Sequence, residues 1–323
     1  MKLSAPYEVV NSSDNYLLLD NVRFSTDGIN YSDKIRYMGV FNELLAKRYN
    51  GIVYLKYQFE LQDMPEKIYF VSEDMHNISC SANGKEIIFN GISDFDKKTY
   101  KADISDKLVK GANEIILKIN FYESDHVYYV LFGENVTESL KNCLVYDSTI
   151  EACYLQGDFG VYSKNGFKNG KTAGVYLSDD DFYIGKRKTQ ITDTVKNGYP
   201  FFAGEITLRK SFFHDGSPAQ LDLTGRFATS YLKINGKEIN KSYFNDTVDI
   251  SNFVKAGENV AEITLYSGNR NLLGPHHYKF EEEPLGVGPG TYENLGSWHN
   301  GVSNNERNSY SFVKFGLFDE DNE

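Results

Sequence analysis

The sequence predicts an all-β protein made of two tandem jelly-roll β-sandwich modules, with one helix near its N-terminus. Three observations support this fold class. The 323 residues include 24 Tyr and 22 Phe but only 7 Pro, and aromatic side chains fit the half-buried surface of a pleated sheet. Short segments of alternating hydrophobicity are separated by Gly, Asn and Asp, as between the strands of a sandwich. A five-residue peptide also recurs in the second half of the chain.

The recurring peptide is Asn-Gly-Lys-Glu-Ile, which occupies residues 83–87 and again residues 235–239. Each copy is followed by Asp-Ile-Ser and then, at the same distance from Asp-Ile-Ser in both copies, by Gly-x-Asn, within residues 103–113 and 249–259. Upstream, the phrase IVYLKYQFEL of the first copy corresponds to EITLRKSFFH of the second. Two copies of one domain of roughly 150 residues explain this agreement.

Each copy has the pattern of antiparallel strands. In the second copy Leu221 and Leu223, and then Leu232 and Ile234, alternate with polar residues, as a strand with one buried face requires. The Asn-Gly dipeptide that follows favours the positive φ values of a type I′ hairpin turn, so residues 237–239 begin the returning strand. The segment after Gly257 predicts a further strand over residues 260–266.

The helix precedes the first module. Ser32 and Asp33 can cap its first turn, Lys47 and Arg48 lie near its end, and Gly51 stops it. Its apolar residues recur at helical spacing and are Ile35, Met38, Phe41, Leu44 and Leu45. The pattern predicts a helix over about residues 33–49.

These signals divide the chain into five parts. The predicted parts are an N-terminal connector with the helix (1–50), the first jelly-roll module (51–145), a strand-rich connector (146–200), the second jelly-roll module (201–318) and a solvated acidic tail (319–323).

Composition excludes several classes of partner. The net charge of −11 and pI near 5.1 oppose nucleic-acid binding, since a phosphate backbone requires a basic surface. No apolar run is long enough to span a membrane, and the N-terminus lacks the apolar stretch of a secretory signal, which predicts a cytoplasmic protein. The three cysteines form no CxxC pair, so neither a disulfide framework nor a zinc site is expected, and no cofactor is predicted.

The order of these phrases resembles a known family. The succession of strand, Asn-Gly-Lys turn, Asp-Ile-Ser, Gly-x-Asn and strand resembles the sugar-binding-like jelly-roll domain of family 2 glycoside hydrolases and the galactose-binding-like domains of rhamnosidase-type enzymes. Further phrases that resemble these proteins are EACYLQGDFGVY (151–162), GYPFFAGEITL (198–208), RNLLGPHHY (270–278) and YSFVKFGL (310–317).

The resemblance implies non-catalytic modules of a larger glycoside hydrolase, because those enzymes carry their catalytic carboxylates on a (β/α)8 barrel. The chain has no alternating strand and helix pattern of the roughly 250 residues that such a barrel needs. We therefore expect carbohydrate binding, or scaffolding of the catalytic domain of a parent enzyme. The expected partners are carbohydrate and that catalytic domain.

Sugar binding by a sandwich uses an aromatic face against the pyranose ring and polar groups against its hydroxyls. The last third of the second module supplies both, and Trp298 is the predicted platform. The candidate residues are Trp298, Arg270, Asn271, His276, His277, Tyr278 and His299. The alternative is that Trp298 fills the core and that the histidine pair is hydrogen-bonded within a domain joint.

Three other interpretations stay open. The run Ser178–Asp181 supplies oxygens for a structural calcium ion, but its spacing matches no known calcium loop, and a solvated turn is the preferred interpretation. A compact hydrolase with a cleft between the modules needs two facing carboxylates, and Glu151, Asp158 and Glu205 lie in the phrases that resemble glycosidases. A protein-interaction or adhesion sandwich is the third interpretation.

Overall fold

The computed structural model describes residues 1–93, 95–179, 181–242, 247–278, 281 and 307–318. The contacts between residues divide the chain into two compact units, and the sequence of unit 2 is inserted within that of unit 1. Of the described residues, unit 1 comprises 1–17, those from 157 to 281 and 307–318, and unit 2 comprises those from 18 to 156. Over the described ranges, no helix is both long and apolar enough to cross a membrane.

Unit 1 contains most of the second predicted module. Its elements are β1 (Tyr7–Ser12), β13 (Gly160–Ser163), β14 (Lys168–Asn169), β15 (Val175–Ser178), β16 (Phe182–Gly185), β17 (Gln190–Ile191), β18 (Glu205–Asp215), β19 (Gln220–Asp222), β20 (Gly225–Arg226), β21 (Thr229–Ile234), β22 (Lys237–Ser242), β23 (Thr247–Asp249), β24 (Ala256–Tyr266), α4 (Arg270–Leu273), β25 (Tyr310–Val313) and β26 (Gly316–Leu317).

Unit 2 contains the first predicted module. Its elements are β3 (Asn21–Ser25), β4 (Ile35–Arg36), α1 (Tyr37–Ala46), β5 (Gly51–Leu61), β6 (Ile68–Glu73), β7 (Asn77–Ala82), β8 (Lys85–Ile87), β9 (Gly91–Ile92), β10 (Thr99–Asp103), the 3₁₀ turn η1 (Ser105–Lys107), β11 (Gly111–Phe121), α2 (Asp125–Phe132) and α3 (Glu138–Asn142). The chain passes between the units within β2 (Asn15–Leu19) and at the end of β12 (Cys153–Gly157).

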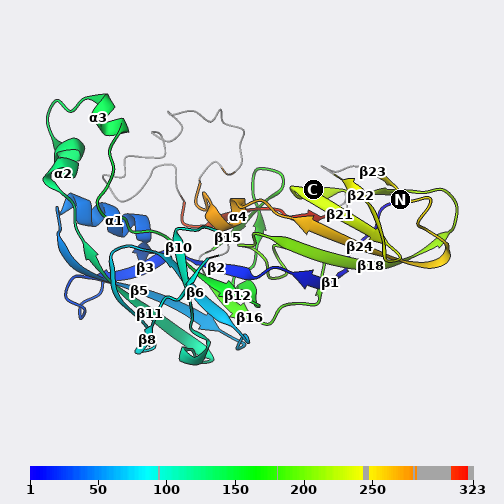
Figure 1. Ribbon diagram of the computed structural model, residues 1–323, viewed down its shortest axis with the longest axis horizontal. Coiled ribbons are helices and arrows are strands. Elements are labelled where there is room, and N and C mark those ends of the chain that lie inside the picture. The colour runs from blue at the N-terminus through cyan, green and yellow to red at the C-terminus, as the bar shows by residue number, and fades with distance from the viewer. Residues whose placement is uncertain (94, 180, 243–246, 279–280, 282–306, 319–323) are drawn as a thin grey trace. The chain divides into compact units, whose positions relative to one another are not determined.

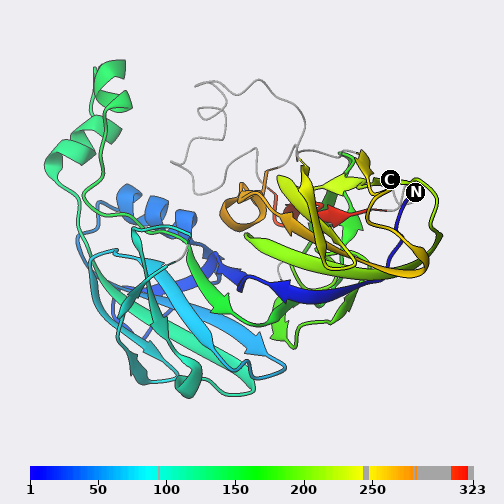
Figure 2. The same cartoon turned by 45° about the vertical axis from the view of Figure 1, so that its right-hand side comes forward.

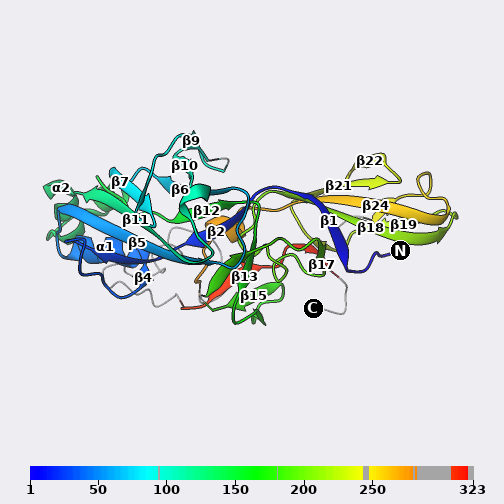
Figure 3. The same cartoon turned by 90° about the horizontal axis from the view of Figure 1, so that it is seen from below.

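The main sheet of unit 1 has the order β17-β1-β18-β24-β21-β22 (Figure 3), and its pairs are antiparallel. Strands β18 and β24 pair along their whole length. Because side chains alternate across a strand, Leu208, Ile263 and Leu232 all point inward, into a core that Leu221 and Ile250 complete. The other face of this sheet therefore carries the intervening side chains.

Unit 2 is built from two layers of antiparallel strands (Figure 1). Strands β5, β11, β7 and β8 form an antiparallel run, and β6, β10 and β9 form another. Tyr57 of β5 and Phe70 of β6 bring the two layers into ring contact at 6.3 Å. The predicted all-β sandwich class is confirmed.

The recurring Asn-Gly peptide makes the predicted turn in both units. The φ values are 48° and 78° at Asn83 and Gly84, and 52° and 76° at Asn235 and Gly236, as a type I′ turn requires. In unit 1 the returning strand begins at Lys237, which confirms the prediction.

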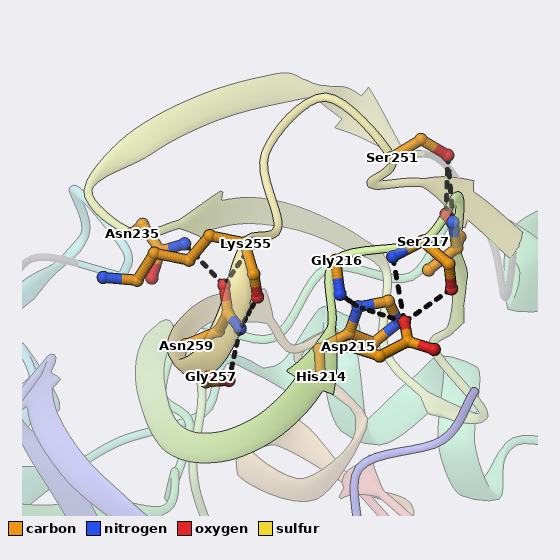
Figure 4. A network of polar contacts seen from close by, with 10 residues as sticks. His214, Asp215, Gly216, Ser217, Asn235, Ser251, Lys255, Gly257 and Asn259 are labelled. Carbon is orange, nitrogen blue, oxygen red and sulfur yellow. Dashed lines mark hydrogen bonds and ion pairs between the residues drawn. The ribbon is translucent and has the colours of Figure 1, made fainter.

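The same hydrogen bonds surround both turns, and Figure 4 shows those of unit 1. Asn235 Nδ2 donates to Asn259 Oδ1 at 2.8 Å, and Asn259 in turn binds both backbone groups of Lys255 and the carbonyl of Gly257. In unit 2, Asn83 donates to Asn113 at 2.8 Å, and Asn113 binds the backbone of Val109 and Gly111. We call each pair an asparagine clamp.

The predicted helix is shorter than the sequence pattern indicated. Helix α1 begins at Tyr37 and ends at Ala46, and its N-cap is Arg36, so the expected start at Ser32 and Asp33 was wrong. Ile35 and Arg36 are extended because they pair with β3. The Ser32 hydroxyl instead accepts a hydrogen bond from the backbone N–H of Phe24.

Unit 2 also contains two short helices that the sequence pattern did not predict. Helices α2 and α3 lie between β11 and β12, on a segment that projects from the strands of its unit (Figure 2). Tyr129 on α2 is 51% exposed.

The unit boundaries cut across the predicted connectors. Residues 1–17 contribute β1, which pairs with β18 of unit 1, whereas β3, β4 and α1 belong to unit 2. The strand-rich connector divides at residue 157.

Candidate functional site

The sequence-predicted sugar ligands are only partly within the described structure. Trp298 and His299 lie outside the described residues, so the Trp298 platform stays a prediction. Arg270 and Asn271 lie in α4, and His276, His277 and Tyr278 follow it. These five residues come together beside β25.

Asn271 and the histidine pair make structural hydrogen bonds there. Asn271 Nδ2 donates to the carbonyl of Val313 at 2.9 Å, and the N–H of Val313 donates back to Asn271 Oδ1 at 2.9 Å. His276 Nε2 lies 2.9 Å from the Asn271 carbonyl, and His277 Nδ1 lies 3.2 Å from the carbonyl of Ser309. Both imidazoles are at least nine-tenths buried, so this arrangement leaves little of them for a ligand.

Arg270 and Tyr278 complete this group. Arg270 Nη2 donates to the hydroxyl of Ser311 at 3.3 Å, and Tyr278 is half-buried. The backbone N–H of Ser311 also donates to the His276 carbonyl at 2.6 Å. Within the described structure, these polar groups connect α4 and the residues after it to β25 by hydrogen bonds.

The carboxylates considered for hydrolysis lie in different surroundings. Asp158 is ion-paired with Arg187 Nε at 2.9 Å, whereas Glu205 lies at the start of β18. Burial raises the pKa of Glu151. Burial also raises the pKa of Glu73, and the nearby charges of Glu151 and Asp96 raise it further. Both Glu73 and Glu151 belong to unit 2.

Two residues of the acidic run proposed for calcium are engaged with protein groups, and Asp180 lies outside the described residues. The Ser178 hydroxyl contacts Ser163 and Gly166, and Asp181 pairs with Lys164 at 3.2 Å. Across the described ranges no three His, Cys, Asp or Glu side chains gather closely enough to hold a metal ion.

A site not predicted from the sequence lies on the outward face of the main sheet of unit 1. Strands β18, β24 and β21 run side by side there (Figure 3), and their inward residues belong to the core. Cross-strand register aligns the outward residues in three rows. The rows are Glu205–Tyr266–Thr229, Thr207–Thr264–Tyr231 and Arg209–Glu262–Lys233.

The first two rows carry an aromatic pair beside hydroxyl groups. The rings of Tyr231 and Tyr266 lie 5.6 Å apart with an interplanar angle of 68°. Tyr231 is 39% exposed. The hydroxyls of Thr207 and Thr264 are hydrogen-bonded at 2.8 Å. We call these six residues, from Glu205–Tyr266–Thr229 and Thr207–Thr264–Tyr231, the tyrosine face.

The third row borders the tyrosine face with paired charges. Arg209 Nε and Nη2 donate to Glu262 Oε1 at 3.0 and 2.7 Å, and Nη1 lies 3.4 Å from Glu8. These hydrogen bonds raise the pKa of Arg209, chiefly through Glu262. Lys233 Nζ lies 3.0 Å from Glu238. The cations on this border are therefore already neutralised by protein carboxylates.

The corresponding positions of unit 2 are different. When the two units are aligned on their asparagine clamps, Ser79 and Asn120 take the positions of Tyr231 and Tyr266, and Lys118 takes that of Thr264. Lys118 Nζ lies 5.6 Å from the ring centroid of Tyr54, the residue that corresponds to Thr207. The tyrosine pair is thus a feature of unit 1, and the shared fold alone does not require it.

The sequence carried one signal of this site. The alternation that identified Leu232 and Ile234 as buried also makes Tyr231 an outward residue, and Tyr266 has the same relation to Leu265. An aromatic residue on the solvent side of a strand needs an explanation other than core packing. The sequence could not show that the two rings meet.

Comparison with known proteins gives similarities of structure only. No protein-family model matches the chain, and no curated protein sequence matches it. A β-D-mannosidase from Dictyoglomus thermophilum is similar at 13% identity and a TM-score of 0.30, over 79% of this chain and 31% of that one. An α-L-rhamnosidase from Streptomyces avermitilis is similar at 14% identity and a TM-score of 0.31, over 71% of this chain and 23% of that one.

A third similar structure is the Ruminococcus gnavus β-glucuronidase, at 14% identity and a TM-score of 0.33, over 83% of this chain and 44% of the other. The chain spans less than half the length of each of these three proteins.

Proposed function

We propose that this chain is a pair of accessory β-sandwich modules, descended from one duplicated domain, of a larger glycoside-hydrolase-like protein. Unit 1 binds carbohydrate on its tyrosine face, and unit 2 acts as a scaffold. The observation that carries this proposal is the exposed Tyr231 in ring contact with the half-buried Tyr266, beside a row of hydroxyls. The resemblance of the ordered sequence phrases to glycosidase sugar-binding domains supports it.

The chemistry of the tyrosine face suits a pyranose. An aromatic ring stacks against the C–H groups of a sugar, while nearby polar groups bind its hydroxyls. Tyr231 supplies an exposed ring, and the Thr207 and Thr264 hydroxyls lie in the same row. The Glu205 carboxylate lies across from Tyr266 and can accept hydrogen bonds from two neighbouring sugar hydroxyls.

The test is a glycan array followed by calorimetric titration of each hit. Loss of a stacked tyrosine removes about 1.5–3 kcal/mol of burial, so Tyr231→Ala weakens binding at least about tenfold. Tyr129→Ala is the matched control, because Tyr129 is also an exposed tyrosine and lies on α2. Circular dichroism confirms that both variants are folded.

The outcomes separate the possible sites. Binding that survives Tyr231→Ala but is lost in Trp298→Ala moves the site to the group that the sequence predicted. No binding to any glycan by the wild-type chain leaves scaffolding as the function of both units.

A second candidate function is hydrolysis, which Glu73 and Glu151 favour. Their raised pKa values are the property expected of a carboxyl group that acts as a general acid near neutral pH. Glycosidases use one such carboxyl group as the acid and a second, ionised one as nucleophile or general base. Hydrolysis of an aryl glycoside that is lost in Glu151→Gln and unaffected by Glu138→Gln, at an exposed carboxylate of α3, supports this function, whereas an inactive wild-type chain excludes it for that substrate.

A further inference from the structure

Among the described side chains of the three rows and their ion-pair partners, most charges are negative. The three rows and their ion-pair partners contain four carboxylates, on Glu205, Glu262, Glu8 and Glu238, and two cations, on Arg209 and Lys233. The overall charge of −11 has the same sign. A ligand approaching this face therefore meets excess negative charge.

Neither cation is available without the loss of an existing bond. Arg209 makes two hydrogen bonds to one oxygen of Glu262 and lies 3.4 Å from Glu8. Lys233 is paired with Glu238 across the β21–β22 hairpin. An acidic sugar that recruited Arg209 would leave two protein carboxylates facing its own carboxylate.

Glu205 faces the tyrosine pair without a neutralising partner. Its carboxylate has no ion-pair partner among the residues that the structure describes, and its register neighbour is Tyr266. An ionised carboxylate only accepts hydrogen bonds. It is suited to the hydroxyl pairs of a neutral sugar, and it repels a uronate or a sulfate ester.

We propose that the tyrosine face selects neutral glycans and rejects glycans that carry carboxylate or sulfate groups. This inference rests on the proposed carbohydrate-binding function of unit 1. Like charges on exposed groups interact over roughly the Debye length, which is about 8 Å at physiological salt. The discrimination is therefore larger at low salt and shrinks as salt is added.

The experiment compares matched soluble tetrasaccharides by calorimetric titration: cellotetraose with its C6-oxidised glucuronate form, and β-1,4-galactotetraose with the same glycan oxidised at C6. Other neutral hits of the array are treated in the same way. We expect each acidic member to bind at least tenfold more weakly than its neutral partner in about 50 mM salt, and the ratio to fall in about 500 mM salt.

The charge mechanism is tested with a matched pair of variants. Glu238→Gln removes a carboxylate next to the third row, and Glu86→Gln changes the corresponding residue of the recurring peptide in unit 2. Glu238→Gln should strengthen binding of the acidic glycan several-fold and leave the neutral glycan within about twofold, since an exposed charge acts mainly through long-range attraction or repulsion. Glu86→Gln should change neither affinity.

The results distinguish this inference from the function on which it rests. Equal or tighter binding of the acidic members, lost in Tyr231→Ala, overturns the selectivity and leaves the binding function intact. Absence of binding by every neutral and acidic glycan of the array overturns both.

Discussion

Each unit contains one asparagine clamp, so the same substitution can be tested separately in the two units. Asn259 is fully buried, and its side chain makes four hydrogen bonds of 2.8–3.0 Å. Asn259→Ala leaves the Asn235 amide and the backbone groups of Lys255 without these partners. Asn113→Ala does the same to Asn83 and Val109 in unit 2.

The magnitude follows from those bonds. Each hydrogen bond contributes about 1 kcal/mol net, and a buried polar group left without a partner costs about 1–3 kcal/mol. Water reaches the Gly257 end of the loop, so not all four groups stay unpaired. We expect each substitution to lower the free energy of unfolding by about 3–5 kcal/mol.

Urea denaturation followed by circular dichroism measures this free energy. Asn169→Ala, at an exposed position of β14, is the control and should change stability by less than about 0.5 kcal/mol. A loss below about 1 kcal/mol in both clamp variants refutes the reasoning, because it means that the clamps are not needed to hold the hairpins.

Three further predictions follow from particular side chains. Because the pKa of Glu151 is raised in the folded state, its ionisation opposes folding as pH rises above the ordinary value of 4.5. Glu151→Gln therefore raises Tm at pH 7, and thermal melts should show this gain vanish near pH 4. Arg187 binds Asp158, the Ser12 hydroxyl and the Ser13 carbonyl, so Arg187→Lys should lower the free energy of unfolding by about 2–3 kcal/mol in urea titrations. Unchanged stability would contradict the role of this guanidinium. Since unit 2 has Ser79 and Asn120 in place of the tyrosine pair, calorimetry should give one glycan site per chain, and two equivalent sites would contradict the assignment to unit 1.

Local backbone chemistry made part of the fold predictable. The Asn-Gly turns were predictable because only residues that tolerate positive φ form a type I′ turn. The start of α1 was not, because Ile35 and Arg36 are extended through pairing with β3, a contact between residues distant in sequence. Helical spacing cannot show that a competing strand takes Ile35 and Arg36, inside the predicted helix.

The candidate site depended even more on distant contacts. Tyr231 and Tyr266 meet because β21 and β24 pair in a particular register, and a sequence pattern gives the outward direction of each side chain but not that register. Conversely, Asn271 and His276 have the polar groups of sugar ligands, yet in the fold they bind β25 and one another. Residue type alone could not distinguish these uses.

The most direct measurement of the central claim is hydroxyl-radical footprinting of the tyrosines by mass spectrometry, with and without a glycan that binds. The account predicts that the glycan protects Tyr231 from oxidation, while the exposed Tyr129 and Tyr100 of unit 2 react at unchanged rates. Unchanged oxidation of Tyr231 together with protection elsewhere would show that the chain binds sugar at a different surface.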